Sequence, residues 1–529
     1  MKIIIADPLP SSAADLLRAE GWTVDARAGR PADELHADLA AADGLIVRSA
    51  TQVDADLLAA APRLRVVARA GTGVDNIDLD AASRRGILVL NAPGVNSISV
   101  AEHALALMLA LARSVPRADA SMKVGRWEKK ALAGAELRGK CLGVLGLGRI
   151  GREVVRRAQA FEMRVVAHDP YISAQIADDL NVELVTLDGL CAEADYISLH
   201  LPSTAGTRGL FDAARLANCK RGVRIVNTAR GDLIDEAALA AAIESGQVAG
   251  AGLDVFETEP PPAATLTGLP QVVATPHIAA STREAQELVG LETATCVREF
   301  LRAGVVRNAV NFPSVSAEEF RRLQPFIGLA ERLGSLLAQL AEDRIEVVGI
   351  RYYGELAHRN HDMLVGAVLV GLFRTMLSST VTLVNAQSIA RQRGLEIVES
   401  HSTRARNFTS LISIKLHTNH GEHWAEGAVF EPQEPRLVLL DGVEVEAPLE
   451  GTLIVIRNSD QPGVIGEVGT ILGRHRLNIA TFALGRGPDG AVGVVSIEPG
   501  GGTSQWNGAE VLDEIRGIPA VRHAAIVQL

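Results

Sequence analysis

Short runs of β-branched residues alternate with alanine- and leucine-rich stretches along about the first 300 residues of the chain. The four strand-like runs of the first series lie at 2–6, 44–49, 65–70 and 86–92. A second series of six such runs begins at Cys141 and ends at His277. This alternation predicts βαβ units with parallel sheets that helices cover. Six strands with helices between them suit a complete doubly wound dinucleotide-binding domain.

The later part of the chain predicts a different organisation. The segment after His277 is helical through about Ala303, and we expect this helix to return to the first domain, which is then split in sequence. After Val310 a helical stretch at 326–343, strand-like runs at 345–356, 411–418 and 436–451, and a second apolar helix at 363–373 predict an α+β domain. From Gly451 the predicted order is β-α-β-β-α-β, the ferredoxin-like order.

Length, composition and charge exclude several classes of protein. A chain of 529 residues is too long for one hydrophobic core and predicts about three or four domains. With 47% apolar and 22% charged residues it is neither disordered nor fibrous. Asp and Glu outnumber Lys and Arg by 63 to 52, giving a net charge of −11. An acidic chain without a long basic run is a poor candidate for binding nucleic acid or an anionic membrane.

The cysteines, the N-terminus and the apolar stretches predict a cytoplasmic protein. The N-terminal MKIIIADPLP has one lysine and a short apolar run, which indicates a first strand and no signal peptide. The apolar stretches at 100–112 and 363–373 are shorter than the roughly 20 residues that span a bilayer. The cysteines show no CxxC and no metal-ligand spacing, so we expect them to be reduced and buried, with no metal site. They are Cys141, Cys191, Cys219 and Cys296.

A glycine-rich turn follows the first strand of the second series and opens a helix. In GLGRIG the glycines are Gly146, Gly148 and Gly151, which permit a tight turn and close approach of a pyrophosphate to the helix N-terminus. Such a turn alone is a weak signal, because the same glycines also serve a turn without a ligand. Asp169 lies 18 residues past Gly151, where a carboxylate accepts hydrogen bonds from a ribose diol and repels a 2′-phosphate. The pattern therefore favours NAD over NADP.

Three polar residues stand at the ends of later strands, where ligands bind in open α/β sheets. They are Arg230, Glu259 and His277. Arginine offers a bidentate fork for a carboxylate, and histidine titrates near neutrality. A carboxylate on the second ring nitrogen would raise the histidine pKa and support it as a general base. Each residue alone is ambiguous, but together they predict hydride transfer to or from a 2-hydroxy acid.

Several strings of the first 305 residues together resemble the D-isomer-specific 2-hydroxyacid dehydrogenases. These are GLGRIG, HDP, VNTARGDLIDE, LDVFETEP and TPHIAASTREAQ. The strings VRSAT, ARAGTGVDNIDL, NAPGVNSISVAEHALALMLALAR and GRWEKK narrow the resemblance to the long-form phosphoglycerate dehydrogenases. VNAQSIARQRG at 384–394 loosely resembles their intervening domain. SDQPGVIGEVGTILGRHRLNIA resembles their ACT domain, including its Asp-x-Pro-Gly turn.

The resemblance implies an α/β fold with a Rossmann-type NAD domain inserted in a flavodoxin-like substrate domain. An α+β domain and a ferredoxin-like ACT domain follow. The implied ranges are 1–97 and 283–306 for the split substrate-binding domain, 98–282 for the NAD-binding domain, 307–450 for the intervening allosteric substrate-binding domain and 451–529 for the ACT regulatory domain.

The resemblance also assigns residues, with catalysis falling on Arg230, Glu259 and His277. The implied NAD contacts are Thr72, Gly146, Gly148, Arg149, Ile150, Gly151, Asp169, Leu201, Thr228, Ala229, Arg230, Asp254, His277, Ile278, Ala279 and Ala280. The implied substrate contacts are Arg48, Ser49, Gly71, Thr72, Gly73 and Asn96. Trp127, Lys129 and Lys130 resemble the segment that reaches a neighbouring subunit, in what we expect to be a homotetramer.

Two further groups are candidate ligand sites in the C-terminal half. Asp460 and Asn478 are the implied effector residues, and Asn458 stands where some long-form relatives carry an aromatic ring near the effector. L-Serine is the expected effector, and the alternative is that this domain only assembles the oligomer. A basic cluster predicts an anion site in the intervening domain, although such clusters are more often a solvated face. Its members are His401, Arg404 and Arg406.

The activity that the resemblance implies is NAD-dependent oxidation of 3-phosphoglycerate, the first step of serine synthesis. His277 would take the hydroxyl proton, Glu259 would orient the imidazole, and Arg230 would hold the carboxylate. In the first domain Arg69 is a further, weaker candidate for an anion contact. A glyoxylate or hydroxypyruvate reductase is the nearest alternative, but reductases that resemble this half lack the C-terminal domains. A non-catalytic nucleotide-sensing protein of the same fold is the alternative from another class.

Overall fold

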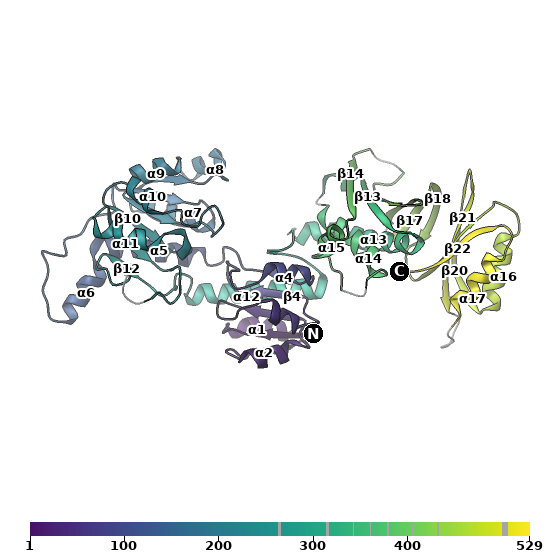
Figure 1. Ribbon diagram of the computed structural model, residues 1–529, viewed down its shortest axis with the longest axis horizontal. Coiled ribbons are helices and arrows are strands. Elements are labelled where there is room, and N and C mark those ends of the chain that lie inside the picture. Colours follow the sequence, from purple (N-terminus) through teal and green to yellow (C-terminus); the bar gives the residue numbers. More distant parts are fainter. Residues whose placement is uncertain are drawn as a thin grey trace.

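The fold consists of four sheets, each with its own helices, in the residues that the structure describes. The structure is a computed structural model that describes residues 1–262, 266–313, 317–341, 343–359, 361–377, 380–404, 407–430, 433–499 and 506–529. We name the four units first to fourth in the order in which the chain enters their sheets. Figure 1 shows them in a row, with the second unit at the left, followed by the first, the third and the fourth.

The first unit is a parallel five-stranded sheet with the order β2-β1-β3-β4-β5. Its strands are β1 (Lys2–Ile5), β2 (Thr23–Asp25), β3 (Gly44–Val47), β4 (Val66–Arg69) and β5 (Leu88–Leu90). Its helices are α1 (Ser11–Arg18), α2 (Ala32–Leu39), α3 (Ala55–Ala59), α4 (Leu79–Arg84) and α12 (Arg283–Ala303). The apolar runs of β1 and β3 are buried on both faces, as parallel strands between helices require. This strand order is flavodoxin-like and confirms the predicted fold class.

The second unit is a parallel seven-stranded sheet with the order β12-β11-β10-β9-β6-β7-β8. Its strands are β6 (Cys141–Leu145), β7 (Arg164–His168), β8 (Glu183–Leu184), β9 (Tyr196–Leu199), β10 (Val223–Asn227), β11 (Val248–Leu253) and β12 (Val272–Ala274). Six of these strands were predicted, and the two-residue edge strand β8 was missed because it carries no apolar run. This is the Rossmann order with one added edge strand.

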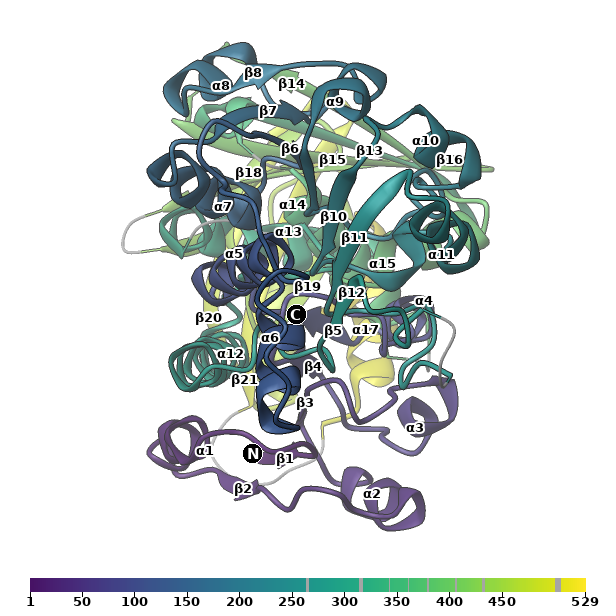
Figure 2. The same ribbon diagram turned by 90° about the vertical axis from the view of Figure 1, so that its left-hand side faces the viewer.

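Helices cover both faces of the second sheet (Figure 2). They are α5 (Ser97–Arg113), α6 (Val115–Lys123), α7 (Arg149–Ala160), α8 (Ala174–Asp179), α9 (Leu187–Glu193), α10 (Ala213–Asn218), the 3₁₀ helix η1 (Gly231–Leu233) and α11 (Glu236–Glu244). Side chains of α5 and α7 form one buried cluster against the sheet, and those of α9, α10 and α11 form the other. The sheet is therefore doubly wound, as predicted.

Helix α12 returns from the second unit to the first, as predicted. It begins at the Thr282 cap, whose side chain accepts a hydrogen bond from the Ala285 N–H, and it ends at Gly304 with φ of +72°. Val297 and Leu301 are buried in the same cluster as β1 and β4. The first unit is thus split in sequence around the second. The predicted domain ranges each enclose one sheet, and their bounds stay predictions.

The third unit is a six-stranded mixed sheet with the order β14-β13-β15-β16-β17-β18. Its strands are β13 (Ile345–Gly354), β14 (Glu396–Ser402), β15 (Ser410–Thr418), β16 (Gly421–Phe430), β17 (Glu434–Leu440) and β18 (Val443–Pro448). Its helices are α13 (Ala317–Leu340), the 3₁₀ helix η2 (Glu355–His358), α14 (Asp362–Arg374) and α15 (Ala386–Gln392). The predicted α+β architecture is confirmed, but the polar strands β14 and β16 were missed.

The fourth unit is an antiparallel sheet with the order β20-β21-β19-β22, which is the predicted ferredoxin-like arrangement. Its elements are β19 (Thr452–Asn458), α16 (Val464–Arg474), β20 (Leu477–Gly487), β21 (Gly490–Pro499), α17 (Gly508–Arg516) and β22 (Val521–Gln528). Consecutive residues of β19 are buried on opposite faces. Ile454 and Ile456 pack with the helices of this unit, whereas Leu453 and Val455 belong to the core of the third unit. The third and fourth units therefore share one continuous core.

The structure also bears on the cysteines and the apolar helices. All four cysteines are free and buried, as predicted. Among the described residues no single helix is long and apolar enough to span a membrane, and α5 and α6 meet that length only as a pair bent by 64°.

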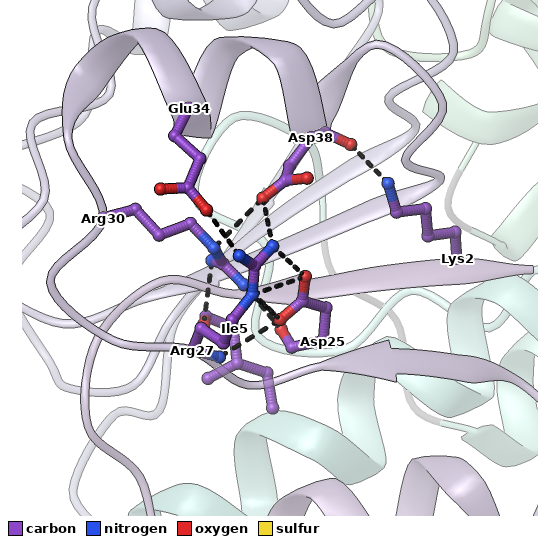
Figure 3. Close-up of polar contacts among 7 residues, drawn as sticks. All are labelled: Lys2, Ile5, Asp25, Arg27, Arg30, Glu34 and Asp38. Atoms are coloured by element: carbon purple, nitrogen blue, oxygen red, sulfur yellow. Dashed lines mark hydrogen bonds and ion pairs between the residues drawn. The ribbon is translucent and has the colours of Figure 1, made fainter.

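A network of charged side chains closes the first unit at the end of β2 (Figure 3). Arg30, whose side chain is 3% exposed, pairs with Asp25 and lies 3.2 Å from Asp38. Arg27 lies 2.7 Å from each of the same two carboxylates and also pairs with Glu34. Hydrogen bonds from Arg27, ahead of those from Arg30, outweigh burial and hold the pKa of Asp25 well below its ordinary value. The network thereby fixes α2 and the loop before it against the edge of the sheet.

We expect Asp25→Asn to lower the local stability of the first unit by about 1–3 kcal/mol, because the buried Arg30 loses a charged partner. Amide hydrogen exchange in β2 and α2 measures this change. Asp33→Asn, which removes an exposed carboxylate of α2, is the matched control and should change little.

The pH dependence of this difference follows from the lowered pKa of Asp25. A carboxylate with a depressed folded-state pKa stabilises the fold above its unfolded pKa of about 3.9, and this contribution is lost as the pH falls through the folded value. The difference in local stability between the wild type and Asp25→Asn should therefore become smaller below about pH 4. Equal exchange rates in wild type and variant at neutral pH would contradict the assigned role of the network.

Candidate active site

The glycine-rich turn between β6 and α7 has the geometry of an anion cradle. Gly146 has φ of +91°, and a Cβ there would lie 2.6 Å from the His200 carbonyl oxygen. A Cβ on Gly151 would lie 2.0 Å from the Gly146 carbonyl oxygen, so this glycine allows α7 to pack against the turn. Gly148 is the N-cap residue of α7, and a Cβ there would have no described atom within 4 Å outside the neighbouring residues. The free N-terminus of α7 and the open space at Gly148 fit a pyrophosphate.

Asp169 lies beside this turn, at the end of β7. Its carboxylate accepts hydrogen bonds from the Leu147 N–H at 2.8 Å and from the Tyr171 N–H at 2.9 Å. Both bonds hold the carboxylate next to the glycine-rich turn, where it was predicted to accept hydrogen bonds from the ribose of the cofactor. The dinucleotide fingerprint is therefore assembled in space as its spacing predicted, and the residues present fit NAD.

The other predicted cofactor residues follow successive strands of the second sheet. After β9 comes Leu201, after β10 come Thr228 and Ala229, and after β11 comes Asp254. After β12 comes the segment His277, Ile278, Ala279 and Ala280, and α7 begins with Arg149 and Ile150. Because the carboxyl ends of parallel strands meet at one edge, these residues gather there, and we name the space between this edge and the first unit the dinucleotide cleft. The Thr228 Oγ1 atom is buried without a hydrogen-bond partner in the described residues. An unpaired buried hydroxyl at this edge is suited to a ligand.

The cleft is bordered on its other side by the first unit. Thr72 lies after β4, and its hydroxyl lies 3.3 Å from the Asn96 side-chain oxygen at the start of α5. The Arg149 side chain donates to the Pro93 carbonyl of the segment after β5. A Cβ on Gly94 would lie 2.0 Å from the Arg149 side chain, so the glycine allows this close approach. The dinucleotide turn and the first unit are thus in direct contact.

Arg230 lies where the two units meet. Its Nη1 donates to the Ala229 carbonyl at 2.7 Å, and its Nη2 lies 3.1 Å from the Asp75 carboxylate of the first unit. A Cβ on Gly73 would lie 1.9 Å from the Arg230 guanidinium, so the predicted substrate turn passes directly over this side chain. A side chain at position 73 would require the guanidinium to move from this place.

Two arginines of the first unit face the same point. Burial lowers the pKa of Arg69, and repulsion from Arg230 and Arg48 lowers it further. The Arg69 Nε is buried without a partner in the described residues, and a Cβ on Gly71 would lie 2.3 Å from its Nη1. The charges of Asp75 and Asp7 offset part of this repulsion, and three arginines grouped in this way suit an anion with more than one charge. The sequence had suggested Arg69 only weakly, since nothing in its neighbours showed that it is buried.

Arg48 and Ser49 follow β3, and the backbone at this turn is fixed by buried polar groups. The Arg48 N–H donates to the Asp7 carboxylate at 2.5 Å, and the Asn76 amide donates to the Arg48 carbonyl at 2.8 Å. The Arg48 side chain is half-buried and Ser49 is exposed. Contact of Arg48 and Ser49 with the substrate stays a prediction.

His277 and Glu259 form a hydrogen-bonded pair at the end of β12. The His277 Nδ1 lies 2.8 Å from the Glu259 Oε2, and the other carboxylate oxygen accepts from the Phe256 N–H at 3.1 Å. The carboxylate therefore fixes the ring through Nδ1 and leaves Nε2 for proton transfer. His277 has φ of +53°, in the left-handed region that few non-glycine residues adopt. Strained backbone of this kind collects at functional sites.

Asp254 holds the loop that carries His277. It is fully buried, and its carboxylate accepts from the Thr275 hydroxyl at 2.6 Å and from the Ile278 and Ala279 N–H groups, each at 2.8 Å. Burial alone would raise the pKa of Asp254, but hydrogen bonds from His103 and from these groups outweigh it and lower the pKa. Contact of Asp254 with NAD stays a prediction, and the bonds seen here position the loop.

His103 and Thr275 were not predicted as site residues. His103, on α5, lies 3.0 Å from the Thr275 hydroxyl through Nε2 and 3.4 Å from the Asp254 carboxylate. In the sequence His103 only interrupts an apolar helix. A polar side chain in an otherwise apolar stretch was the one available signal that it has a buried polar partner.

The predicted effector residues lie at opposite ends of the fourth sheet. Asp460 lines a pocket of about 450 Å³ with Asn458, Gln461 and Arg486, and its carboxylate lies 3.2 Å from the Arg486 guanidinium. Asn478 opens β20, eight residues before Arg486, which is about 27 Å along a strand. Asp460 and Asn478 of one chain are therefore not brought together.

The predicted basic cluster of the third unit is only partly described. The His401 ring stacks on that of His361 at 5.9 Å, and His361 stacks on Tyr352 at 3.9 Å. Arg404 is exposed, and Arg406 lies outside the described residues. An anion site at this cluster stays a prediction.

Comparison with known proteins agrees with this architecture. The family described as D-isomer specific 2-hydroxyacid dehydrogenase, NAD binding domain, matches residues 105–279. The family described as D-3-phosphoglycerate dehydrogenase intervening domain matches residues 322–441. D-3-phosphoglycerate dehydrogenase of Archaeoglobus fulgidus is 44% identical over 93% of this chain and 94% of its own. That of Methanocaldococcus jannaschii is 41% identical over 100% of both chains.

A solved structure carries the bound cofactor of such a fold. D-lactate dehydrogenase from Aquifex aeolicus, complexed with NAD and lactic acid, is 30% identical, with a TM-score of 0.52. It covers 59% of this chain and 100% of its own.

We expect Asp254→Asn to loosen the loop that carries His277 and to destabilise it by about 1–3 kcal/mol, because an amide nitrogen then faces backbone N–H donors. Amide exchange at Ile278 and Ala279 should accelerate. Asp188→Asn, which changes an 86% exposed carboxylate, is the matched control. Unchanged exchange at both amides would exclude the positioning role of Asp254.

Proposed function

Because the chain belongs to the D-3-phosphoglycerate dehydrogenase family, we propose that Arg230, Glu259 and His277 carry out its catalysis. The protein is an NAD-dependent dehydrogenase that oxidises 3-phospho-D-glycerate to 3-phosphohydroxypyruvate, the first step of L-serine synthesis. The observation that carries the residue assignment is the 2.8 Å bond between His277 and Glu259 at the mouth of the dinucleotide cleft.

In the proposed mechanism His277 accepts the substrate hydroxyl proton at Nε2. Glu259 holds the ring through Nδ1 and stabilises the imidazolium that forms. Arg230 binds the substrate carboxylate and polarises the forming carbonyl group. NAD, when bound, supplies the acceptor for the hydride that leaves C2 of the substrate. The bonds to Asp254 hold the loop and keep the base in place despite the strained backbone of His277.

Substrate recognition is proposed to rest on the arginines that converge at the cleft. A phosphorylated 2-hydroxy acid carries a carboxylate and a phosphate, and Arg230 with Arg48 and Arg69 offers several cations. Burial, ahead of repulsion from Arg230 and Arg48, lowers the pKa of Arg69, and a bound anion would offset both effects. Ser49, Asn96 and the turn of Gly71, Thr72 and Gly73 are the proposed neutral contacts.

The alternative reductase activity is not favoured by any observation. Relatives named D-3-phosphoglycerate dehydrogenase match this chain over nearly its whole length, including the third and fourth units.

We expect His277→Asn to lower kcat by about 10² to 10⁴, the usual contribution of a positioned acid–base group. NAD affinity should remain near that of the wild type, because no bond to the dinucleotide turn is lost. NADH absorbance with 3-phosphoglycerate measures kcat, and a fluorescence titration measures NAD binding. His358→Asn, an exposed histidine of η2, is the matched control. Nearly full turnover of His277→Asn would refute the assigned base.

We further propose that the fourth unit is an ACT-type domain that binds L-serine. The pocket at Asp460 offers a carboxylate for an ammonium group and the Arg486 guanidinium for a carboxylate, which is the charge pattern of an amino acid. The backbone of the Asp-Gln-Pro-Gly turn leads into α16, whose N-terminus also favours a carboxylate. Asn478 would come from a second chain, because in one chain it lies at the far end of β20.

A homotetramer and a cytoplasmic location complete the proposal. Helix α6 and the segment after it project from the second unit (Figure 1), and Trp127 there is 78% exposed. Val124 and Met122 on the same projection are also exposed, and an apolar patch of this kind is typical of a subunit interface. Lys129 and Lys130, next to Trp127, are proposed to reach a neighbouring active site. The four buried, unpaired cysteines support a reducing compartment.

We expect millimolar L-serine to slow the wild-type enzyme and Asp460→Ala to abolish the effect, since the ammonium group loses its partner. A coupling free energy of about 1–3 kcal/mol corresponds to a change of about 5- to 150-fold in serine affinity between the two states. Initial rates and calorimetry with serine measure both ends of this coupling. Asp489→Ala, an exposed carboxylate of the β20–β21 turn, is the matched control. If serine changes neither the rate of the wild type nor the calorimetric signal, the fourth unit does not bind serine and its role is limited to assembly.

A further inference from the structure

A cavity of about 820 Å³ lies between the first and third units, away from the dinucleotide cleft. The first unit contributes the segments around Arg65 and Gly86 and the end of α12. The third unit contributes α13 and the segment before α15. Ligand pockets are typically of about 300–1,000 Å³, so the size suits a small molecule. No catalytic or cofactor residue assigned above lines it.

The walls of the cavity are fixed by bonds between the two units. The Thr382 hydroxyl donates to the Gly86 carbonyl at 2.9 Å, and the Asn385 amide, 2% exposed, lies 3.4 Å from the Arg84 carbonyl. The side chain of Asn311 caps the open edge of β5. Its Oδ1 accepts a hydrogen bond from the Val89 N–H, and its Nδ2 donates to the Ile87 carbonyl. The cavity is therefore built by both units and is not a loose surface fold.

The floor of the cavity is apolar. Phe300, Phe312 and Phe320 contribute aromatic rings, and Ile327 and Leu383 contribute aliphatic side chains. Phe320 is buried, with Phe312, Ile327 and Leu383 packed against its cluster. An apolar floor excludes a small, fully hydrated anion such as the substrate, because burying its charge there has no compensation.

The rim of the cavity carries an excess of positive charge. Four arginines and one aspartate line it, namely Arg63, Arg65, Arg84, Arg85 and Asp43. Asp43 pairs with Arg63 at 3.3 Å, and the Arg65 guanidinium lies over the Phe300 ring at 5.6 Å. Arg84 and Arg85 are exposed, and the described residues give their side chains no ion pair. In an acidic protein, an uncompensated cationic rim on an apolar cavity selects an amphipathic anion.

We propose that this cavity binds an amphipathic organic anion, an unbranched apolar chain that ends in a carboxylate or a phosphate. The chain lies on the phenylalanine floor and the anionic head lies among the rim arginines. Because residues of both units line the cavity, the bound ligand bridges them and fixes their relative orientation. This site is distinct from the dinucleotide cleft and from the pocket at Asp460.

Calorimetric titration of the full-length protein tests the proposal with four probes, below micelle-forming concentrations. Decanoate and decyl phosphate carry both chain and head, decanol carries only the chain, and inorganic phosphate carries only the head. We expect saturable binding of one or both amphipathic anions and at least about tenfold weaker binding of decanol and phosphate. Preference between decanoate and decyl phosphate identifies the head group. If decanol binds as tightly as the amphipathic anions, the proposed role of the arginines is wrong. If inorganic phosphate binds as tightly, the proposed role of the apolar floor is wrong.

Variants place the binding in this cavity. Arg84→Gln with Arg85→Gln should weaken binding of the amphipathic anion by about tenfold or more, the loss expected for charge-assisted bonds. Val384→Trp fills the cavity without changing its charge and should also abolish binding. Arg221→Gln, an exposed arginine of the second unit, is the matched control, and dehydrogenase activity verifies that each variant is folded.

Two results would overturn the proposal. Binding that survives both sets of changes would place the anion elsewhere. No saturable heat from either anion, together with an altered oligomeric state of the double arginine variant, would assign the cavity to a second copy of the chain.

Discussion

The buried carboxylate of Asp254 is the constraint on which the geometry of the active site depends. It satisfies two backbone N–H groups and the Thr275 hydroxyl at the point where the chain leaves the second sheet. Together with the hydrogen bond from the His277 N–H to the Asp254 carbonyl, these bonds hold His277 at a positive φ, which costs of the order of 1 kcal/mol or more. His103 adds a further bond from α5, so the base is fixed from the strand, the loop and a helix together. The pairing with Glu259 then orients a ring whose backbone is already in place.

Much of the fold could be predicted because parallel strands and covering helices leave a strong pattern. The runs of β1 and β3 are apolar at every position after Lys2, and six further runs of this kind predicted the doubly wound second unit. The missed strands are those that lack this pattern. β8 has two residues, and β14 at the edge of the third sheet is mostly exposed, so neither burial nor periodicity marks it. β16 begins with polar residues and becomes buried only in its second half.

The site could be predicted where chemistry follows local spacing, and not where it depends on the meeting of two units. The glycine turn and Asp169 were found from spacing alone, and the structure places them side by side. The convergence of Arg69 with Arg230 arises from how the first unit faces the second, which no local pattern encodes. Asn478 shows the same limit for the fourth unit, because it lies at the other end of the sheet from Asp460, and no spacing along the chain reveals this separation.

The burial of β19 on both faces has a consequence for how this enzyme can be recombined. Leu453 and Val455 complete the core of the third unit, while Ile454 and Ile456 complete that of the fourth. Cutting the chain between these units would expose a row of aliphatic side chains on each fragment, which favours aggregation. A chimera that keeps the third and fourth units together, with its junction before α13, avoids this exposure.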